Sequence, residues 1–204
     1  LEEALQLGFM QVLPRIHVCQ PAGGFPFVRA YLLALSEIAR RSGFPFDLDY
    51  QHGADPRVQL EKTMAFSHVG RDQIQAVANF VKSHFDSPAM QSFLIEMAGE
   101  AGPFMWPWDG GTPHSLAHGI LDDVTYDWYY LLRAVLRSGG RAEILAEETI
   151  RDAYVKAQSY TGIPVCPTGA AGLAGLIQLT DSGAINRGES AGLFFTGFDR
   201  SKIG

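Results

Sequence analysis

The second half of the chain alternates short β-rich runs with helical segments, and this alternation restricts the fold more than any other sequence feature. The patterns predict a helix at 127–138, a strand at 141–145, a helix at 147–159, a short buried strand or extended turn at 162–167, a helix at 168–179 and a final strand at 189–196. A regular succession of strands and helices is typical of α/β domains with a mostly parallel sheet. We therefore expect an α/β fold.

The first half begins with the same two kinds of segment and then becomes helical. Residues 15–19 form a β-rich run between turn residues, and 26–41 carry apolar residues at helical spacing. Further helices are expected at 72–85 and from Pro88 onward, whereas 99–113 is rich in Gly, Pro and Trp and is expected to be a loop.

Composition excludes several classes of partner. The 204 residues carry a net charge of −6 and contain no basic run, which argues against nucleic acid or an anionic membrane as the main partner. No apolar run reaches the length of a membrane helix, and no signal peptide is recognisable at the N-terminus. The two cysteines, Cys19 and Cys166, lie apart in apolar runs, so we expect a cytoplasmic protein with reduced thiols.

Two segments at predicted strand ends could bind a ligand. Cys166 to Gly172 leads a strand into a helix whose first turn has only small side chains, which allow a flat or anionic ligand to approach free backbone amides. Close packing of helix on sheet explains the small residues equally well. The run Leu193–Gly197 ends in a threonine and a glycine, and the Thr196 hydroxyl could bond a ligand ring atom or form a local turn.

Other motifs give little support for chemistry. His114 and His118 would share one helix face near Asp122 and Asp123, but this pattern is common by chance and we expect no metal. The tryptophans Trp106, Trp108 and Trp128 are expected in walls and core. The sequence contains neither a nucleophile elbow nor a Walker-type phosphate loop.

Three ordered segments carry a resemblance to a known family: 161–176 (TGIPVCPTGAAGLAGL), 181–189 (DSGAINRGE) and 194–197 (FFTG). Together they resemble the end of threonine synthase and, more broadly, fold-type II pyridoxal-phosphate enzymes of the tryptophan synthase β superfamily. The resemblance covers 12–43 and 105–204. It implies that 1–43 and 106–204 are the C-terminal part of a three-layer cofactor-binding α/β domain, and that 44–105 is a mainly helical insertion.

The resemblance also implies roles for particular residues. The implied cofactor-binding positions are Cys166, Thr168, Gly169, Ala170, Thr196 and Gly197. Thr196 would face the pyridine nitrogen of pyridoxal phosphate, and Cys166 stands where the family commonly has Glu. The loop at 105–118 would help to shape the substrate pocket. A parallel sheet joining 15–19, 141–145 and 191–196 is a requirement of this interpretation.

The sequence departs from the family pattern at the Schiff-base lysine. None of the four lysines lies in the context of the family's Schiff-base lysine. In the family this lysine lies upstream of the phosphate loop, and the resemblance implies that both belong to a segment before Leu1. The sequence therefore leaves open whether this chain is itself an enzyme.

We expect the C-terminal part of a pyridoxal-phosphate-dependent lyase that acts by elimination or replacement on an amino acid such as O-phosphohomoserine. The alternatives are a threonine or serine dehydratase, an ammonia lyase, or a non-catalytic α/β fragment that self-associates. The expected partners are a small amino-acid substrate and either further copies of the chain, as in a dimer, or the missing N-terminal half.

Overall fold

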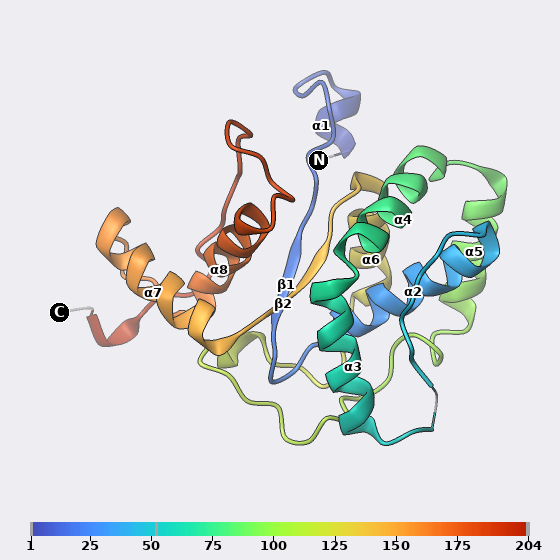
Figure 1. Ribbon diagram of the computed structural model, residues 1–204. Helices are drawn as coiled ribbons and strands as arrows, with labels where there is room; N and C mark the ends of the chain where they lie inside the picture. Colours follow the sequence, from blue (N-terminus) through green and yellow to red (C-terminus); the bar gives the residue numbers. More distant parts are fainter. Residues whose placement is uncertain (1, 52, 203–204) are drawn as a thin grey trace.

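Two short strands pair in parallel between two groups of helices (Figure 1). The computed structural model describes residues 2–51 and 53–202. Strand β1 (Val18–Pro21) pairs with β2 (Ala142–Leu145), with Val18 opposite Ala142 and Pro21 opposite Leu145. Helices α7 (Glu147–Thr161) and α8 (Pro167–Asp181) lie on one side of this pair. Helices α2 (Pro26–Ser42), α4 (Arg71–His84) and α6 (Trp128–Ser138) lie on the other side.

The remaining elements connect or extend these layers. They are α1 (Glu2–Gln6), α3 (Pro56–Val69), α5 (Pro88–Gly99) and two short 3-10 helices, η1 (His118–Ile120) and η2 (Arg200–Lys202). The predicted α/β class and the parallel pairing are confirmed. No helix in the described ranges is both long enough and apolar enough to span a membrane.

The first strand runs further along the chain than its sequence pattern predicts. Val18 N donates to Arg141 O, and Ala22 N donates to Leu145 O. The residues at 19 and 21, which alternate with these donors, therefore direct their backbone N–H and C=O positions away from β2. Pro21 takes one of these outward positions, where its missing N–H removes no bond of the ladder. The strand can therefore include a proline that reads as a turn signal.

The predicted third strand at 189–196 is wrong. In the described residues, this segment pairs with neither β1 nor β2. It runs along α8, where a Cβ on Gly172 would lie 2.7 Å from Leu193 Cδ1. The predicted strand at 162–167 is reduced to one antiparallel bridge between Val165 and Phe198. Cys166 N donates to Gly197 O and Asp199 N donates to Pro164 O, so the chain just after the predicted third strand bonds to the 162–167 segment and not to the central sheet.

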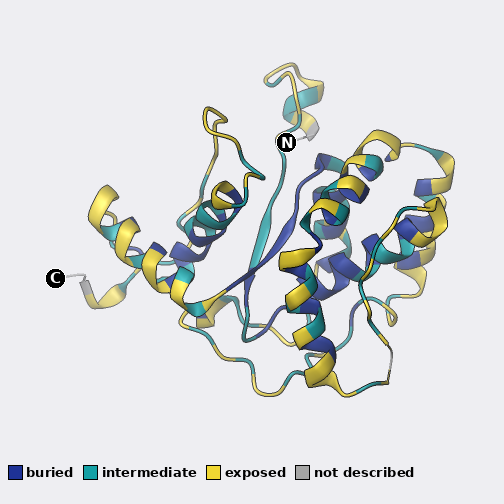
Figure 2. Cartoon of the chain, in the orientation of Figure 1, coloured by how far each residue is buried: buried dark blue, intermediate teal, exposed yellow. Residues whose placement is uncertain are grey.

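The helices of the 44–105 segment share one core with the helices around the sheet. Leu60, Val77 and Leu94 of α3, α4 and α5 belong to the same buried cluster as Leu32 of α2 and Leu132 of α6. Figure 2 shows these helices with buried inner faces and exposed outer faces. Burial of apolar surface therefore holds α3–α5 onto α2 and α6.

Helix α3 has no clear apolar pattern in the sequence. Three of its four buried residues are polar: Gln59, Thr63 and Ser67. The start of the helix is defined more clearly than its buried face. The Asp55 side chain accepts a hydrogen bond from Arg57 N, and Pro56 occupies the first helical position.

Candidate functional site

Four of the predicted cofactor residues lie together at the start of α8. Cys166 is the N-cap of this helix, and Thr168, Gly169 and Ala170 form its first turn. Ala170 N bonds to Cys166 O at 3.0 Å, and no side chain caps the helix. The N–H groups of Thr168 and Gly169 therefore have no acceptor within the helix, as is general for the first turn of a helix.

Gly197 comes against this turn from the end of the C-terminal segment. Cys166 N donates to Gly197 O at 3.1 Å. A Cβ on Gly197 would lie 2.8 Å from Gly169 N, and a Cβ on Gly169 would lie 2.7 Å from Gly197 N. Both positions therefore have to be glycine for the two backbones to approach this closely.

A third segment reaches the same turn from the loop before α6. Gly119 N donates to Thr168 Oγ1 at 3.1 Å, and Leu116 N donates to Glu147 Oε2 at 2.8 Å. The 105–118 loop was expected near the site, but Gly119 and Glu147 were not singled out in the sequence. We call the group of Gly119, Cys166, Thr168, Gly169, Ala170 and Gly197 the α8 cradle.

Thr196 stands beside the cradle without joining it. Along 193–199, half-buried side chains alternate with exposed ones, and Thr196 is exposed between Phe194 and Phe198. Within the described residues its hydroxyl forms no hydrogen bond. The segment thus has an outward face formed by these three side chains.

The lysines lie away from the cradle. Lys62 of α3 pairs with Asp49, the side chain of Lys82 of α4 lies against Gly139, and Lys156 is exposed on α7. The fourth, Lys202, belongs to η2.

The two histidines predicted to share a helix face do not do so. The short helix η1 begins at His118, and His114 precedes it in a loop, where its backbone N–H bonds to Gly23 O at 3.3 Å. In the described ranges, no three His, Cys, Asp or Glu side chains gather as a metal site would require.

The tryptophan loop, residues 105–113, packs on α2 as a wall. Trp108 meets Phe25 edge-on at 4.8 Å between ring centroids, and Met105 is buried beneath the loop. The guanidinium of Arg29, on α2, lies over the Trp106 ring at 3.8 Å. Burial lowers the pKa of Arg29, and the neighbouring Asp109 carboxylate opposes this shift.

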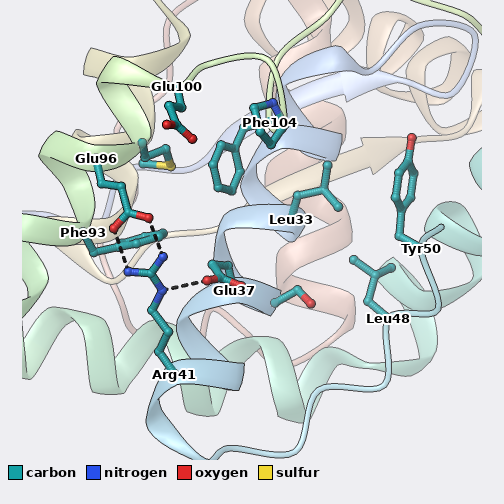
Figure 3. Close-up of a pocket in the computed structure, with 12 residues that line it drawn as sticks. Leu33, Glu37, Arg41, Leu48, Tyr50, Phe93, Glu96, Glu100 and Phe104 are labelled. Carbon is teal, nitrogen blue, oxygen red and sulfur yellow. Dashed lines mark hydrogen bonds and ion pairs between the residues drawn. The ribbon is translucent and has the colours of Figure 1, made fainter. Parts of the chain in front are cut away.

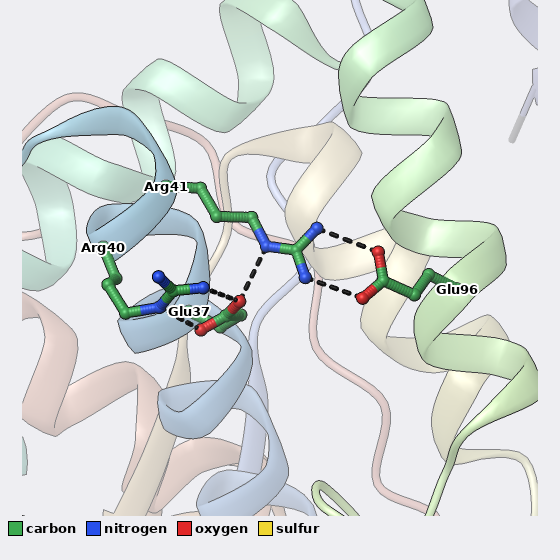
Figure 4. A network of polar contacts seen from close by, with 4 residues as sticks. All are labelled: Glu37, Arg40, Arg41 and Glu96. Carbon is green, nitrogen blue, oxygen red and sulfur yellow. Dashed lines mark hydrogen bonds and ion pairs between the residues drawn. The ribbon is translucent and has the colours of Figure 1, made fainter.

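A separate hollow of about 330 Å³ lies between α2, α5 and the segments at 48–50 and 103–104 (Figure 3). Its floor is apolar, with Leu33, Phe93 and Phe104, and Arg41 lies over the Phe93 ring at 4.8 Å. Figure 4 shows Arg41 bound by both oxygens of Glu96 and by Glu37. No cradle residue lines this hollow.

His17 lies where the C-terminal segment is tied to the start of β1 by an ion pair between Arg15 and Glu189. Burial, with the charges of Arg15 and Arg141, lowers the pKa of His17 to about 4, against the opposing charge of Glu189. The neutral ring accepts a hydrogen bond at Nδ1 from Arg141 N at 3.2 Å. Protonation removes this acceptor.

We expect the free energy of unfolding to fall as the pH is lowered from 6.5 toward 4. The unfolded state, with an ordinary histidine pKa of about 6.5, binds the proton that folded His17 resists. Denaturation of the wild type and of His17→Gln at pH 7.0, 5.5 and 4.5 measures this dependence. An equal pH dependence in both proteins would assign the loss to other groups.

No protein-family model matches the chain, and no curated protein matches it in sequence.

Proposed function

We propose that this chain provides the C-terminal half of the cofactor site of a pyridoxal-phosphate-dependent lyase of the threonine-synthase kind. The observation that carries the proposal is the convergence of two separate segments on the first turn of α8. Gly197 and Gly119 both meet residues that the sequence resemblance had assigned to the cofactor. The three-stranded parallel sheet that the family interpretation requires is not formed in the described residues, so the proposal rests on the α8 cradle and the sequence motifs alone and not on the family's fold.

The cradle offers small side chains and, next to them, a hydroxyl. Gly169 and Gly197 pack their backbones against each other, and the exposed Thr196 side chain directly precedes Gly197. When bound, pyridoxal phosphate supplies an electron sink for negative charge developing on an amino-acid substrate. A neutral hydroxyl at Thr196 would leave the pyridine nitrogen largely unprotonated, which suits elimination or replacement.

The residues of this chain fit only part of that cofactor. They offer a hydroxyl, amides and small side chains, while the lysines at 62, 82, 156 and 202 lie on other elements. In this proposal the chain binds and orients the ring, and a lysine elsewhere moves protons. The reaction could be that of threonine synthase, a dehydratase or an ammonia lyase, which share this half of the site.

The test is a titration of the isotope-labelled chain with pyridoxine 5′-phosphate, followed by NMR. This probe lacks the aldehyde, so it cannot react with surface lysines. We expect shifts confined to the amides of Gly169, Ala170 and Gly197, with a Kd of about 1 mM or weaker because half of the site is absent. Thr196→Val should weaken binding further, whereas Thr180→Val, at the far end of α8, should not.

Inorganic phosphate is the matched control for the probe. The family's phosphate loop is not part of this sequence, so phosphate alone should leave the cradle amides unshifted. Shifts caused equally by phosphate, or no shifts with either compound, would contradict the proposal. The second outcome would favour the self-associating fragment, for which Phe194 and Phe9, 83% and 81% exposed, provide apolar surface.

A further inference from the structure

We infer that Arg29 is a positioning residue for the α8 cradle, which it serves by holding the tryptophan loop in place. This inference rests on the proposed function, because it assigns a role in the same site. Arg29 itself does not touch the cradle. The connection between them is the chain that runs from Trp106 to Gly119.

Arg29 is the one charged side chain on the buried face of α2. Its side chain is 0% exposed, among neighbours such as Phe25, Val28 and Leu32. In the sequence the only sign is a single charge within an otherwise apolar helical stripe. An apolar residue would fill this position at lower desolvation cost, so a charge here calls for a specific partner.

That partner is the backbone and side chains of the tryptophan loop. Arg29 Nη1 donates to Asp109 Oδ1 at 2.8 Å, and Nη2 donates to Trp106 O at 2.6 Å. The guanidinium plane also lies over the Trp106 ring. Trp106 Nε1 donates to the second oxygen of Asp109 at 2.9 Å, which closes the arrangement. Three contacts with the loop therefore depend on one side chain, and the planar fork of arginine matches them.

The held loop leads directly into the cradle. After Asp109 the chain is fixed again at His114, whose N–H bonds to Gly23 O next to α2. It then passes Leu116, bonded to Glu147, and reaches Gly119, bonded to Thr168. Trp108 N also bonds to Asp123 O at 2.8 Å, so the loop contacts the chain beyond Gly119 as well. A displacement of the loop at Trp106 would therefore reach Gly119 both through the chain before it and through Asp123 after it.

Glycine at position 23 allows the loop backbone at His114 to pack directly against the backbone before α2. A Cβ there would collide with the backbone oxygen of His114, so the loop lies directly on the backbone that precedes α2. Because the two anchors of the loop are Gly23, just before α2, and Arg29, near the start of α2, the N-terminal end of this helix sets where the loop enters the cradle.

The experiment is amide hydrogen exchange, read by NMR, in Arg29→Met. We expect exchange at Gly119 and Leu116 to be at least about tenfold faster than in the wild type. Arg29→Lys should recover only part of the protection, because an ammonium cannot match both Asp109 and the Trp106 carbonyl as a planar fork does. Asp109→Asn, at a partly exposed position, should change the same amides in the same direction and serves if Arg29→Met does not fold.

Arg41→Met is the matched control. Arg41 is on the same helix, has two carboxylate partners and lies over an aromatic ring, but it faces the separate hollow (Figure 4). Exchange at Gly119 should stay at the wild-type rate in this variant. If Arg29→Met and Asp109→Asn leave Gly119 as protected as Arg41→Met does, the inference is wrong. No cofactor is used, so this outcome is independent of whether pyridoxine 5′-phosphate binds.

Discussion

Gly169→Ala should lower the free energy of unfolding by about 3 kcal/mol, although alanine is the better helix former. Helix propensity alone favours alanine by up to about 1 kcal/mol. The new Cβ would nevertheless meet both N and O of Gly197, and a Cβ–N distance of 2.7 Å is far below contact distance. Backbone atoms held by a hydrogen bond cannot move aside as a flexible side chain can, so overpacking outweighs propensity.

Chemical denaturation measures this loss, and Gly99→Ala provides the control. Gly99 ends α5, and a Cβ on it would have no neighbouring atom within 4 Å, so alanine there should leave stability equal or slightly higher. In Gly169→Ala the amide of Cys166, which bonds to Gly197 O, should also exchange faster. A Gly169→Ala protein as stable as the wild type would show that Gly197 does not lie against α8.

Glu143→Ala should reduce the free energy of unfolding by about 3–5 kcal/mol, which is typical when one member of a buried ion pair is removed. Glu143 of β2 is 2% exposed and lies 2.9 Å from Arg141 Nε. Its other oxygen accepts a hydrogen bond from Gln178 of α8 at 2.8 Å. Alanine leaves the buried Arg141 guanidinium without a counter-charge and removes one link between sheet and helix.

Two further variants separate the buried charge from a general effect of losing a carboxylate. Replacing both partners, as Arg141→Met with Glu143→Met, should recover much of the lost stability because no unpaired charge stays buried. Glu96→Ala, which removes the exposed partner of Arg41, should change stability little. Equal losses in Glu143→Ala and Glu96→Ala, measured by urea denaturation, would contradict this account.

Elements with strong local signals were predictable from the sequence. Helix α6 begins within a residue of its predicted start and ends at Gly139, whose φ of 69° is one that glycine adopts without strain. Strand β2 was predicted at 141–145 and spans Ala142–Leu145. These segments depend on apolar periodicity and on end signals, which the sequence contains in full.

Five of the six cradle residues were among the residues assigned to the cofactor from the sequence, but their arrangement was not predictable. The motif around Thr168 and Gly169 indicated a close approach of some kind, and Gly197 indicated another. The sequence alone could not show that Gly169 and Gly197 lie against each other, so that a side chain on either one would collide with the backbone of the other. Gly119 had no distinctive pattern, because its function here depends on a hydroxyl 49 positions away along the chain.

The third strand shows a local pattern that tertiary structure does not turn into a strand. Half-buried and exposed positions alternate along 193–199, but a strand also needs a neighbouring edge with which to pair. Gly197 O accepts a hydrogen bond from Cys166 N instead, and Asp199 N donates to Pro164 O, beside α8.

The sequence by itself determined the α/β class, most helix positions and the residues around which a site could form, because these follow from spacing, turn residues and side-chain size. Tertiary structure alone decided that Gly169 meets Gly197, that Gly119 joins them and that the buried Arg29 holds the tryptophan loop. These are contacts between segments far apart in the chain, and no local pattern specifies which distant backbone will occupy the space that a small side chain leaves.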